Sequence, residues 1–144
     1  MVESDTIKLL RECDAGIIMG VDSIDDVLSH VKDERLKRTL ETCKEEHEKL
    51  KEKLQEQLAD YQDDGKNPNP VAKGMSWMKT MGKMMMDDSD ATIADLMTDG
   101  SNMGVKSLSR YLNQYAAADE DSKNITKDLI QLEEKLSVDM RAYL

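Results

Sequence analysis

The chain contains no phenylalanine, one tryptophan, two prolines and two cysteines among 144 residues. Strands draw on aromatic and β-branched side chains, so the shortage of aromatic residues favours an all-α protein. A helix that spans a bilayer needs about 20 mostly apolar residues, and the sequence has no such stretch. The start of the chain also lacks a basic segment followed by an apolar run, as a signal peptide would have. We therefore expect a cytoplasmic protein with no membrane partner.

Charged side chains are abundant, and the formal net charge is −10. Nucleic acids and anionic membrane surfaces are bound by basic protein surfaces. The acidic balance therefore argues against both partners. The length of the chain suits a single domain with a core of useful size.

Four amphipathic helices are predicted by apolar residues spaced three or four apart. The second and fourth helices share one series of steps at an offset of 82 residues, and the first and third match at an offset of 84. Internal symmetry of this kind indicates a doubled structural unit. The predicted helices cover residues 5–31, 34–62, 90–116 and 119–143.

The lengths of the links predict how these helices connect. Two very short links can only join antiparallel neighbours, which gives one hairpin at 5–62 and a second at 90–143. A return along the bundle needs at least about 12 extended residues, which the crossover at 63–89 exceeds. Two hairpins joined by a long crossover have the ferritin-like bundle topology. We expect one domain of this kind over 1–144.

Glycine pairs interrupt the first and third helices at matching places. Gly16 and Gly20 stand one turn apart, and Gly100 and Gly104 repeat them. A glycine inside a helix costs roughly 1 kcal/mol relative to alanine, which packing offsets where backbones approach closely. We therefore predict a helix contact at all four glycines, with the first and third helices crossing there. The alternative is that both helices break at glycine.

The doubled hairpin, the crossover and the segments ECDAGI (Glu12–Ile17) and EEH (Glu45–His47) resemble the ferritin-like superfamily. Within it, the chain is most similar to small bacterial ferritin-like proteins of uncharacterised function. Active members hold two metals with a Glu from each of two helices and Glu-x-x-His from the other two. This chain instead has Lys44 three residues before His47, and Thr126 and Leu129 at the equivalent places in the fourth helix. We therefore expect a degenerate ligand set, with no di-metal site and no cofactor.

A few polar residues still lie on the predicted seam between the helices. Cys43 and His47 are four residues apart, a spacing that can bind zinc, but their repeat partners are apolar, which favours core packing. Asp14 comes close to the level of His47, so a hydrogen bond or a bridging water between them is open. We interpret these groups as a polar layer that fixes helix register. The alternative is a vestigial ligand pocket of Asp14, Cys43, His47 and Thr98.

The crossover is rich in methionine. Asn69 and Pro70 form a good helix start, and an amphipathic helix is predicted over 70–86. Methionine faces adapt to irregular surfaces, which favours packing or partner binding, whereas spaced thioethers can also bind copper(I). The residues predicted to form a partner or oligomer surface are Met75, Trp77, Met78, Met81 and Met85.

These observations favour a non-catalytic structural or protein-interaction bundle over an enzyme. We expect a homo-oligomer, with the methionine-rich segment as a contact surface for another copy or for a protein partner. The alternative is a metal-handling protein that stores or redox-cycles iron, as ferritin-like relatives do, or that binds copper(I) through methionine.

Overall fold

The computed structural model describes residues 4–63 and 87–144. Within these residues the chain forms four α-helices and a short 3₁₀ helix, and no strand. The elements are α1 (Asp5–Leu28), α2 (Glu34–Asp60), α4 (Asp90–Gln114), α5 (Glu120–Met140) and η1 (Arg141–Tyr143). The all-α prediction is confirmed for the described residues, and the helix boundaries agree with the predicted ones to within three residues. The predicted helix over 70–86 lies outside the described residues.

Each α-helix begins after a residue whose side chain caps it. Ser4, Asp33, Ser89 and Asp119 each accept a hydrogen bond from a backbone N–H two or three residues further on. Such side chains satisfy donors that the first turn of a helix leaves unpaired. Both α1 and α4 continue through their glycines without a break. The alternative of helices broken at glycine is therefore wrong.

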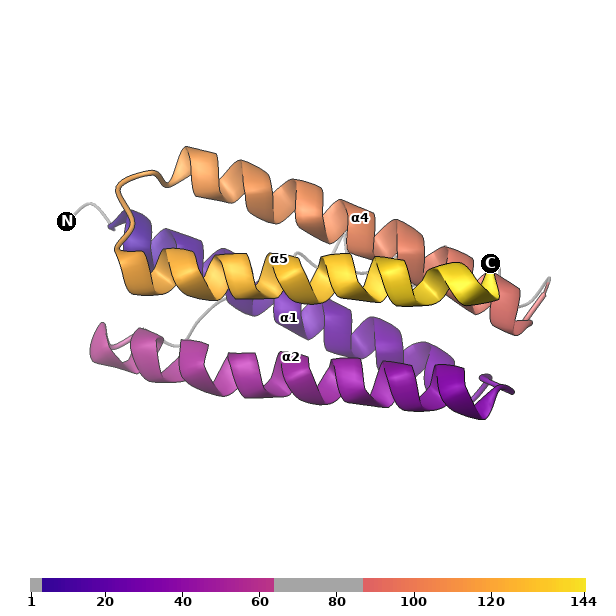
Figure 1. Ribbon diagram of the computed structural model, residues 1–144. Helices are drawn as coiled ribbons and strands as arrows, with labels where there is room; N and C mark the ends of the chain where they lie inside the picture. Colours follow the sequence, from indigo (N-terminus) through magenta and orange to yellow (C-terminus); the bar gives the residue numbers. More distant parts are fainter. Residues whose placement is uncertain (1–3, 64–86) are drawn as a thin grey trace.

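The helices pack as two antiparallel hairpins, α1 with α2 and α4 with α5 (Figure 1). Both α1 and α5 contact all three other helices, which places α2 and α4 at opposite corners. Arg11, near the start of α1, pairs with Asp63 just after α2. Lys32, between α1 and α2, pairs with Asp88 just before α4. The residues that follow α2 and precede α4 therefore lie at opposite ends of the bundle, so α2 and α4 run in the same direction.

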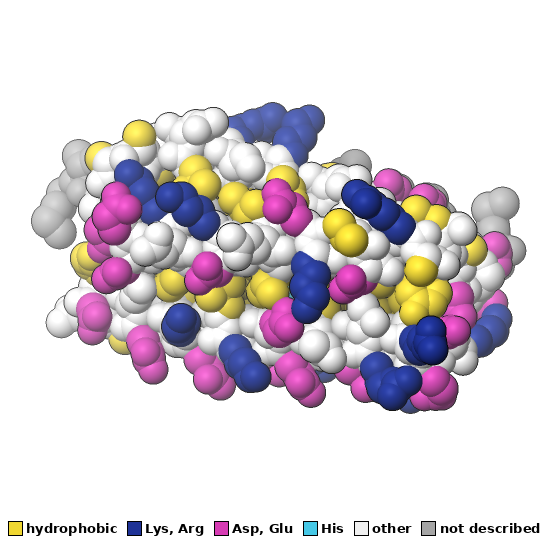
Figure 2. Space-filling model, viewed as in Figure 1, with side chains coloured by type: hydrophobic (Ala, Val, Ile, Leu, Met, Phe, Trp, Pro, Cys, Tyr) yellow, Lys and Arg dark blue, Asp and Glu magenta, His cyan; other side chains and the backbone are white. Residues whose placement is uncertain are grey.

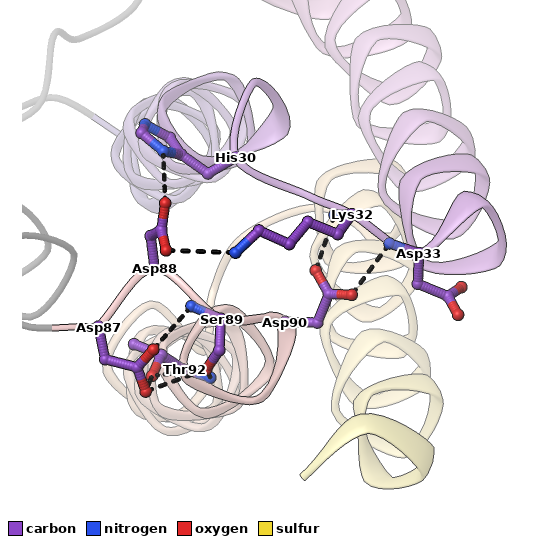
Figure 3. A network of polar contacts seen from close by, with 8 residues as sticks. All are labelled: His30, Lys32, Asp33, Asp87, Asp88, Ser89, Asp90 and Thr92. Carbon is purple, nitrogen blue, oxygen red and sulfur yellow. Dashed lines mark hydrogen bonds and ion pairs between the residues drawn. The ribbon is translucent and has the colours of Figure 1, made fainter.

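An aspartate at the first position of each hairpin binds the link of the other hairpin. The two carboxylate oxygens of Asp90 accept hydrogen bonds from the backbone N–H groups of Lys32 and Asp33, both at 2.9 Å (Figure 3). At the other end of the bundle, Asp5 accepts a hydrogen bond from the backbone N–H of Ala117 at 3.1 Å. These contacts fix the two hairpins against each other at both ends.

The side of α2 that faces the core is built from the predicted seam positions. Every seam residue of α2 from Leu36 to Leu58 is buried, whereas Tyr61 is 43% exposed. The buried apolar side chains form two clusters, one that includes Ile24 and Leu40 and one that includes Ile17 and Leu54. Charged side chains cover the helix surfaces, and hydrophobic ones show in the grooves between helices (Figure 2). No described helix combines the length and the apolar character needed to cross a membrane.

Candidate functional site

A buried ion pair joins α2 to α5 in the interior of the bundle. His47 Nε2 lies 2.9 Å from Glu133 Oε1, and the two side chains are only 1% and 11% exposed. Charged groups this far from solvent are rare unless they are paired, because desolvation strongly disfavours an isolated charge. The pair is therefore the feature of the core that most needs an explanation.

The contacts of His47 identify its protonation state. Its Nδ1 lies 2.8 Å from the backbone carbonyl oxygen of Cys43, which can only accept a hydrogen bond. Its Nε2 faces the Glu133 carboxylate, which also accepts. Both ring nitrogens therefore carry a proton. Burial alone would lower the pKa of His47, but hydrogen bonds to the side chains of Cys43 and Glu133, together with the charges of these two groups, raise it to about 10.

Two glycines make room for the pair. A Cβ atom on Gly20 would lie 3.4 Å from the ring of His47, and one on Gly104 would lie 3.3 Å from the carboxyl carbon of Glu133. Helical side chains lean toward the N-terminus of their helix, which brings both side chains to the levels of these glycines. The nearest atoms to a Cβ at Gly20 or Gly104 belong to side chains of α2 and α5. α1 and α4 do contact each other, and the predicted crossing of their backbones through these glycines stays a prediction.

The other glycine of each pair has a different environment. A Cβ atom on Gly100 would meet no atom of residues 4–63 and 87–144 within 4 Å, so this part of the chain provides no helix contact at Gly100. A Cβ atom on Gly16 would lie 3.9 Å from Leu129, an ordinary van der Waals distance. Only one glycine of each pair is thus tightly enclosed.

The ion pair lies between the two apolar clusters of the core. Cys43 and Leu136 belong to one cluster, whereas Leu50 and Leu129 belong to the other. His47 lies on α2 between Cys43 and Leu50, and Glu133 lies on α5 between Leu129 and Leu136. The pair therefore forms a polar layer between the two apolar clusters.

Two further hydroxyl groups on α4 belong to the polar interior. Ser101 is 1% exposed, and its Oγ is the buried side-chain polar atom that has no hydrogen-bond partner within the described part of the chain. Thr98 donates a hydrogen bond to the backbone carbonyl of Ala94 at 2.7 Å. The hydroxyl of Thr98 is therefore satisfied within its own helix.

The structure does not assemble the predicted vestigial pocket. Asp14 accepts a hydrogen bond from Gln55 Nε2 at 3.0 Å, and both nitrogens of His47 are bonded elsewhere. The direct Asp14–His47 hydrogen bond that the sequence left open is thus absent. Of the four predicted pocket residues, Cys43 and His47 are in contact, with Sγ 3.6 Å from Nδ1.

The other cysteine, Cys13, lies in the core. Cys13 is fully buried, and its Sγ lies 3.1 Å from the Thr126 hydroxyl. That hydroxyl donates its own proton to the carbonyl of Ser122, so the thiol of Cys13 is the donor in their hydrogen bond. Burial raises the pKa of the Cys13 thiol to about 12, which keeps it protonated.

The residues at the ligand positions of a di-metal site make contacts of other kinds. Lys44 pairs with Asp25 at 2.6 Å, and the hydrogen bond to Asp25 raises the pKa of Lys44. Leu129 is buried among apolar side chains. Within residues 4–63 and 87–144, no three His, Cys, Asp or Glu side chains come together as a metal-binding group.

The predicted partner or oligomer surface cannot be placed. Met75, Trp77, Met78, Met81 and Met85 all lie outside the described residues. They stay a prediction.

The sequence reasoning missed Glu133. The offset of 82 residues between the second and fourth helices matches Leu50 with Leu132 and so predicts Leu132 in the core, but Leu132 is half-buried and Glu133 is buried. The available signal was the spacing of Glu133, four residues after Leu129 and three before Leu136, which also fits a helical seam. A buried histidine on the opposite helix then calls for an anionic partner.

Comparison with known proteins gives no relative for this arrangement. No protein-family model, curated protein or solved structure matches the chain. The function must therefore be inferred from the residues and their contacts.

Proposed function

We propose that the chain is a non-catalytic bundle of ferritin-like topology that acts as a structural or protein-interaction element and has no di-metal site. The observation that carries this proposal is the state of His47. A histidine binds a metal through an unprotonated ring nitrogen. Here a carbonyl and a carboxylate bind the two ring nitrogens, so His47 has no lone pair to offer.

The direction of the helices supports the ferritin-like topology. α2 and α4 run in the same direction, as two hairpins joined by a crossover along the bundle require. The contacts of Asp5 and Asp90 support the doubled hairpin, because each of these aspartates binds the link of the other hairpin. Both aspartates follow a capping serine, Ser4 and Ser89.

The charge balance of the site also favours a structural role. In a di-metal site, several carboxylates and histidines surround two metal ions, whose positive charge balances the carboxylates. At the centre of this bundle the Glu133 carboxylate is matched by the His47 imidazolium. The charges of the pair cancel without a metal ion. The pair can fix the register between α2 and α5.

Elemental analysis tests this proposal. The full chain, purified without a chelator, would be incubated with iron(II), manganese(II), zinc(II) or copper(I) and desalted. We expect iron, manganese and zinc well below one ion per chain. Two bridged ions between the helices would refute the proposal, and Glu133→Gln is the matched control that shows whether any bound metal uses the ion pair.

Copper(I) tests the metal-handling alternative in particular. Stoichiometric copper(I) that is lost when Met75, Met78 and Met81 are replaced by leucine would favour that alternative, because leucine keeps the volume but removes the thioether. The proposed oligomer has a separate test. Met78→Ala should lower the oligomer mass in sedimentation if the methionine face lies between copies.

A further inference from the structure

The groove between α2 and α5 contains a hollow of about 220 Å³ that is lined by Cys43. Thr39 and Thr42 line it from the same helix, and Leu132 and Leu136 line it from α5. This groove lies on the face shown in Figures 1 and 2, where hydrophobic side chains appear between the two helices. Cys43 therefore lies at the boundary between this hollow and the core, with 7% of its surface exposed.

The opposite side of Cys43 faces the ion pair. Its Sγ lies 3.6 Å from His47 Nδ1, whose proton is already directed at the Cys43 carbonyl. His47 in turn is held by Glu133. A nucleophilic sulfur, an imidazolium and a carboxylate are thus placed in series, which is the order found where a thiol is supported by a histidine and a third orienting group.

We propose that Cys43 is a site of oxidation by hydrogen peroxide, which reaches the sulfur through the hollow between α2 and α5. The thiol first loses its proton to solvent. The sulfur then bonds to one peroxide oxygen, the O–O bond breaks, and the other oxygen leaves as hydroxide. Sulfur is oxidised by two electrons to sulfenic acid and the peroxide is reduced by two.

The position of His47 supports the anionic sulfur species. An N–H group of an imidazolium 3.6 Å from the sulfur is near enough to be shared between the Cys43 carbonyl and a negative charge on sulfur or on a sulfenate oxygen. His47 is itself fully buried, so this charge is not screened by water on the core side.

The rim of the hollow favours a small uncharged oxidant. Arg38 and Lys135 lie at the rim together with Glu46 and Asp139, so the charges of the four side chains balance. Lys135 is already paired with Glu46 at 3.6 Å. A charged or bulky disulfide therefore gains nothing at the rim and does not fit a sulfur that is almost entirely buried. Hydrogen peroxide meets neither obstacle.

Cys13 is a matched internal control. It is fully buried, bonded to Thr126 and not among the residues that line this hollow. The chain has only these two cysteines, so Cys13→Ala isolates Cys43 and Cys43→Ala isolates Cys13. Each variant would be exposed to hydrogen peroxide in the presence of a sulfenic-acid trap, and the adduct would be followed by intact mass.

We expect Cys43 to be oxidised at least about tenfold faster than Cys13, because reactivity follows thiol exposure and the stabilisation of the sulfur anion. A smaller ratio overturns the proposal. A bulky aromatic disulfide should label neither cysteine in the native state, and rapid labelling of Cys43 by this reagent would overturn the small-oxidant specificity.

His47→Gln tests the role of the imidazolium in the Cys13→Ala background. If His47 supports the sulfur anion, oxidation of Cys43 becomes slower. If His47 only holds the helices together, the loosened bundle exposes the thiol and oxidation becomes faster, which overturns this part of the proposal. Glu133→Gln keeps a hydrogen-bonding side chain and should also slow the oxidation of Cys43. This second variant provides the test if His47→Gln does not fold.

Discussion

Separating the two members of the His47–Glu133 pair tests directly what the pair contributes. Glu133→Leu removes the carboxylate that lies 2.9 Å from Nε2, at a place where the side chains are 11% and 1% exposed. Removing one partner of a buried ion pair typically costs about 3–5 kcal/mol, because the remaining charge is left without compensation. Replacing both partners by hydrophobic residues is often neutral or stabilising by about 1–4 kcal/mol. We therefore expect Glu133→Leu to be much less stable than the double variant with His47→Leu.

His47 can reduce the cost of losing Glu133 by releasing a proton. In Glu133→Leu, burial lowers the pKa of His47 and the carboxylate no longer opposes this effect. The folded state of this variant then disfavours the proton that the unfolded chain takes up near pH 6.5. Its stability should therefore fall further as the pH is lowered from 7 to 5, whereas the double variant should show no such additional loss.

Urea unfolding followed by circular dichroism at pH 5 and pH 7 measures these effects. Lys135→Leu is the control, because Lys135 forms another pair between α2 and α5 with Glu46, at 3.6 Å and largely exposed. Its loss should cost less than about 1 kcal/mol. The reasoning is refuted if Glu133→Leu costs no more than this control. It is also refuted if the losses of the two single variants simply add in the double variant.

The remaining predictions concern pH, the glycines and the link between hairpins. The pKa of His47 is raised from 6.5 to about 10, so its contribution to stability is complete below pH 6.5 and is lost as the pH rises through 10. Urea midpoints should therefore fall between pH 6.5 and pH 10. The measurement uses a Cys13→Ala background, because the raised pKa of the buried Cys13 thiol would cause a separate loss of stability above pH 9. Gly100→Ala should stabilise the chain by up to about 1 kcal/mol. Gly20→Ala should destabilise it by about 1–3 kcal/mol, because the added methyl group crowds the buried ring of His47. Melting temperatures that shift in the same direction for both variants would contradict this prediction. Asp90→Ala should cost about 1 kcal/mol, because two backbone N–H groups lose their acceptor, and an unchanged melting temperature would show that water replaces it.

The periodicity of the sequence predicted the helices because burial of one helical face requires apolar residues three or four apart. That signal fixes which side of α2 faces inward, and all its seam positions from Leu36 to Leu58 are buried. The signal is weaker at the edge of the seam, where the spacing of apolar residues allows either of two adjacent residues to face the core. In α5 the helix is rotated so that Glu133 enters the core and Leu132 lies half outside.

The glycines show a second limit of sequence reasoning. Their spacing correctly indicated that α1 and α4 stay helical, but it could not identify what fills the space left by each missing side chain. That depends on the length and direction of side chains from other helices. Gly20 and Gly104 adjoin the ion pair, whereas Gly100 has no neighbour within 4 Å among the described residues. A pattern of small residues therefore predicts that another group can come close, but it does not predict which group does.

The ion pair lies where the two halves of the sequence differ. At the repeat offset of 82, His47 corresponds to Leu129 and Glu133 corresponds to Lys51. Cys43 likewise corresponds to Ile125, a buried apolar residue. Residues that both halves share can be explained by the packing that both halves need.

Residues found in one half alone need a different explanation, since the other half packs without them. The glycines strengthen this argument, because Gly20 and Gly104 are shared by both halves but enclose a single asymmetric pair. Leucine at the counterpart of His47 shows that an apolar side chain suits a position of this kind in the core. The shared packing of the two halves therefore does not explain the His47–Glu133 layer and the adjacent Cys43, and a role particular to this bundle, such as fixing the register between α2 and α5, has to be sought there.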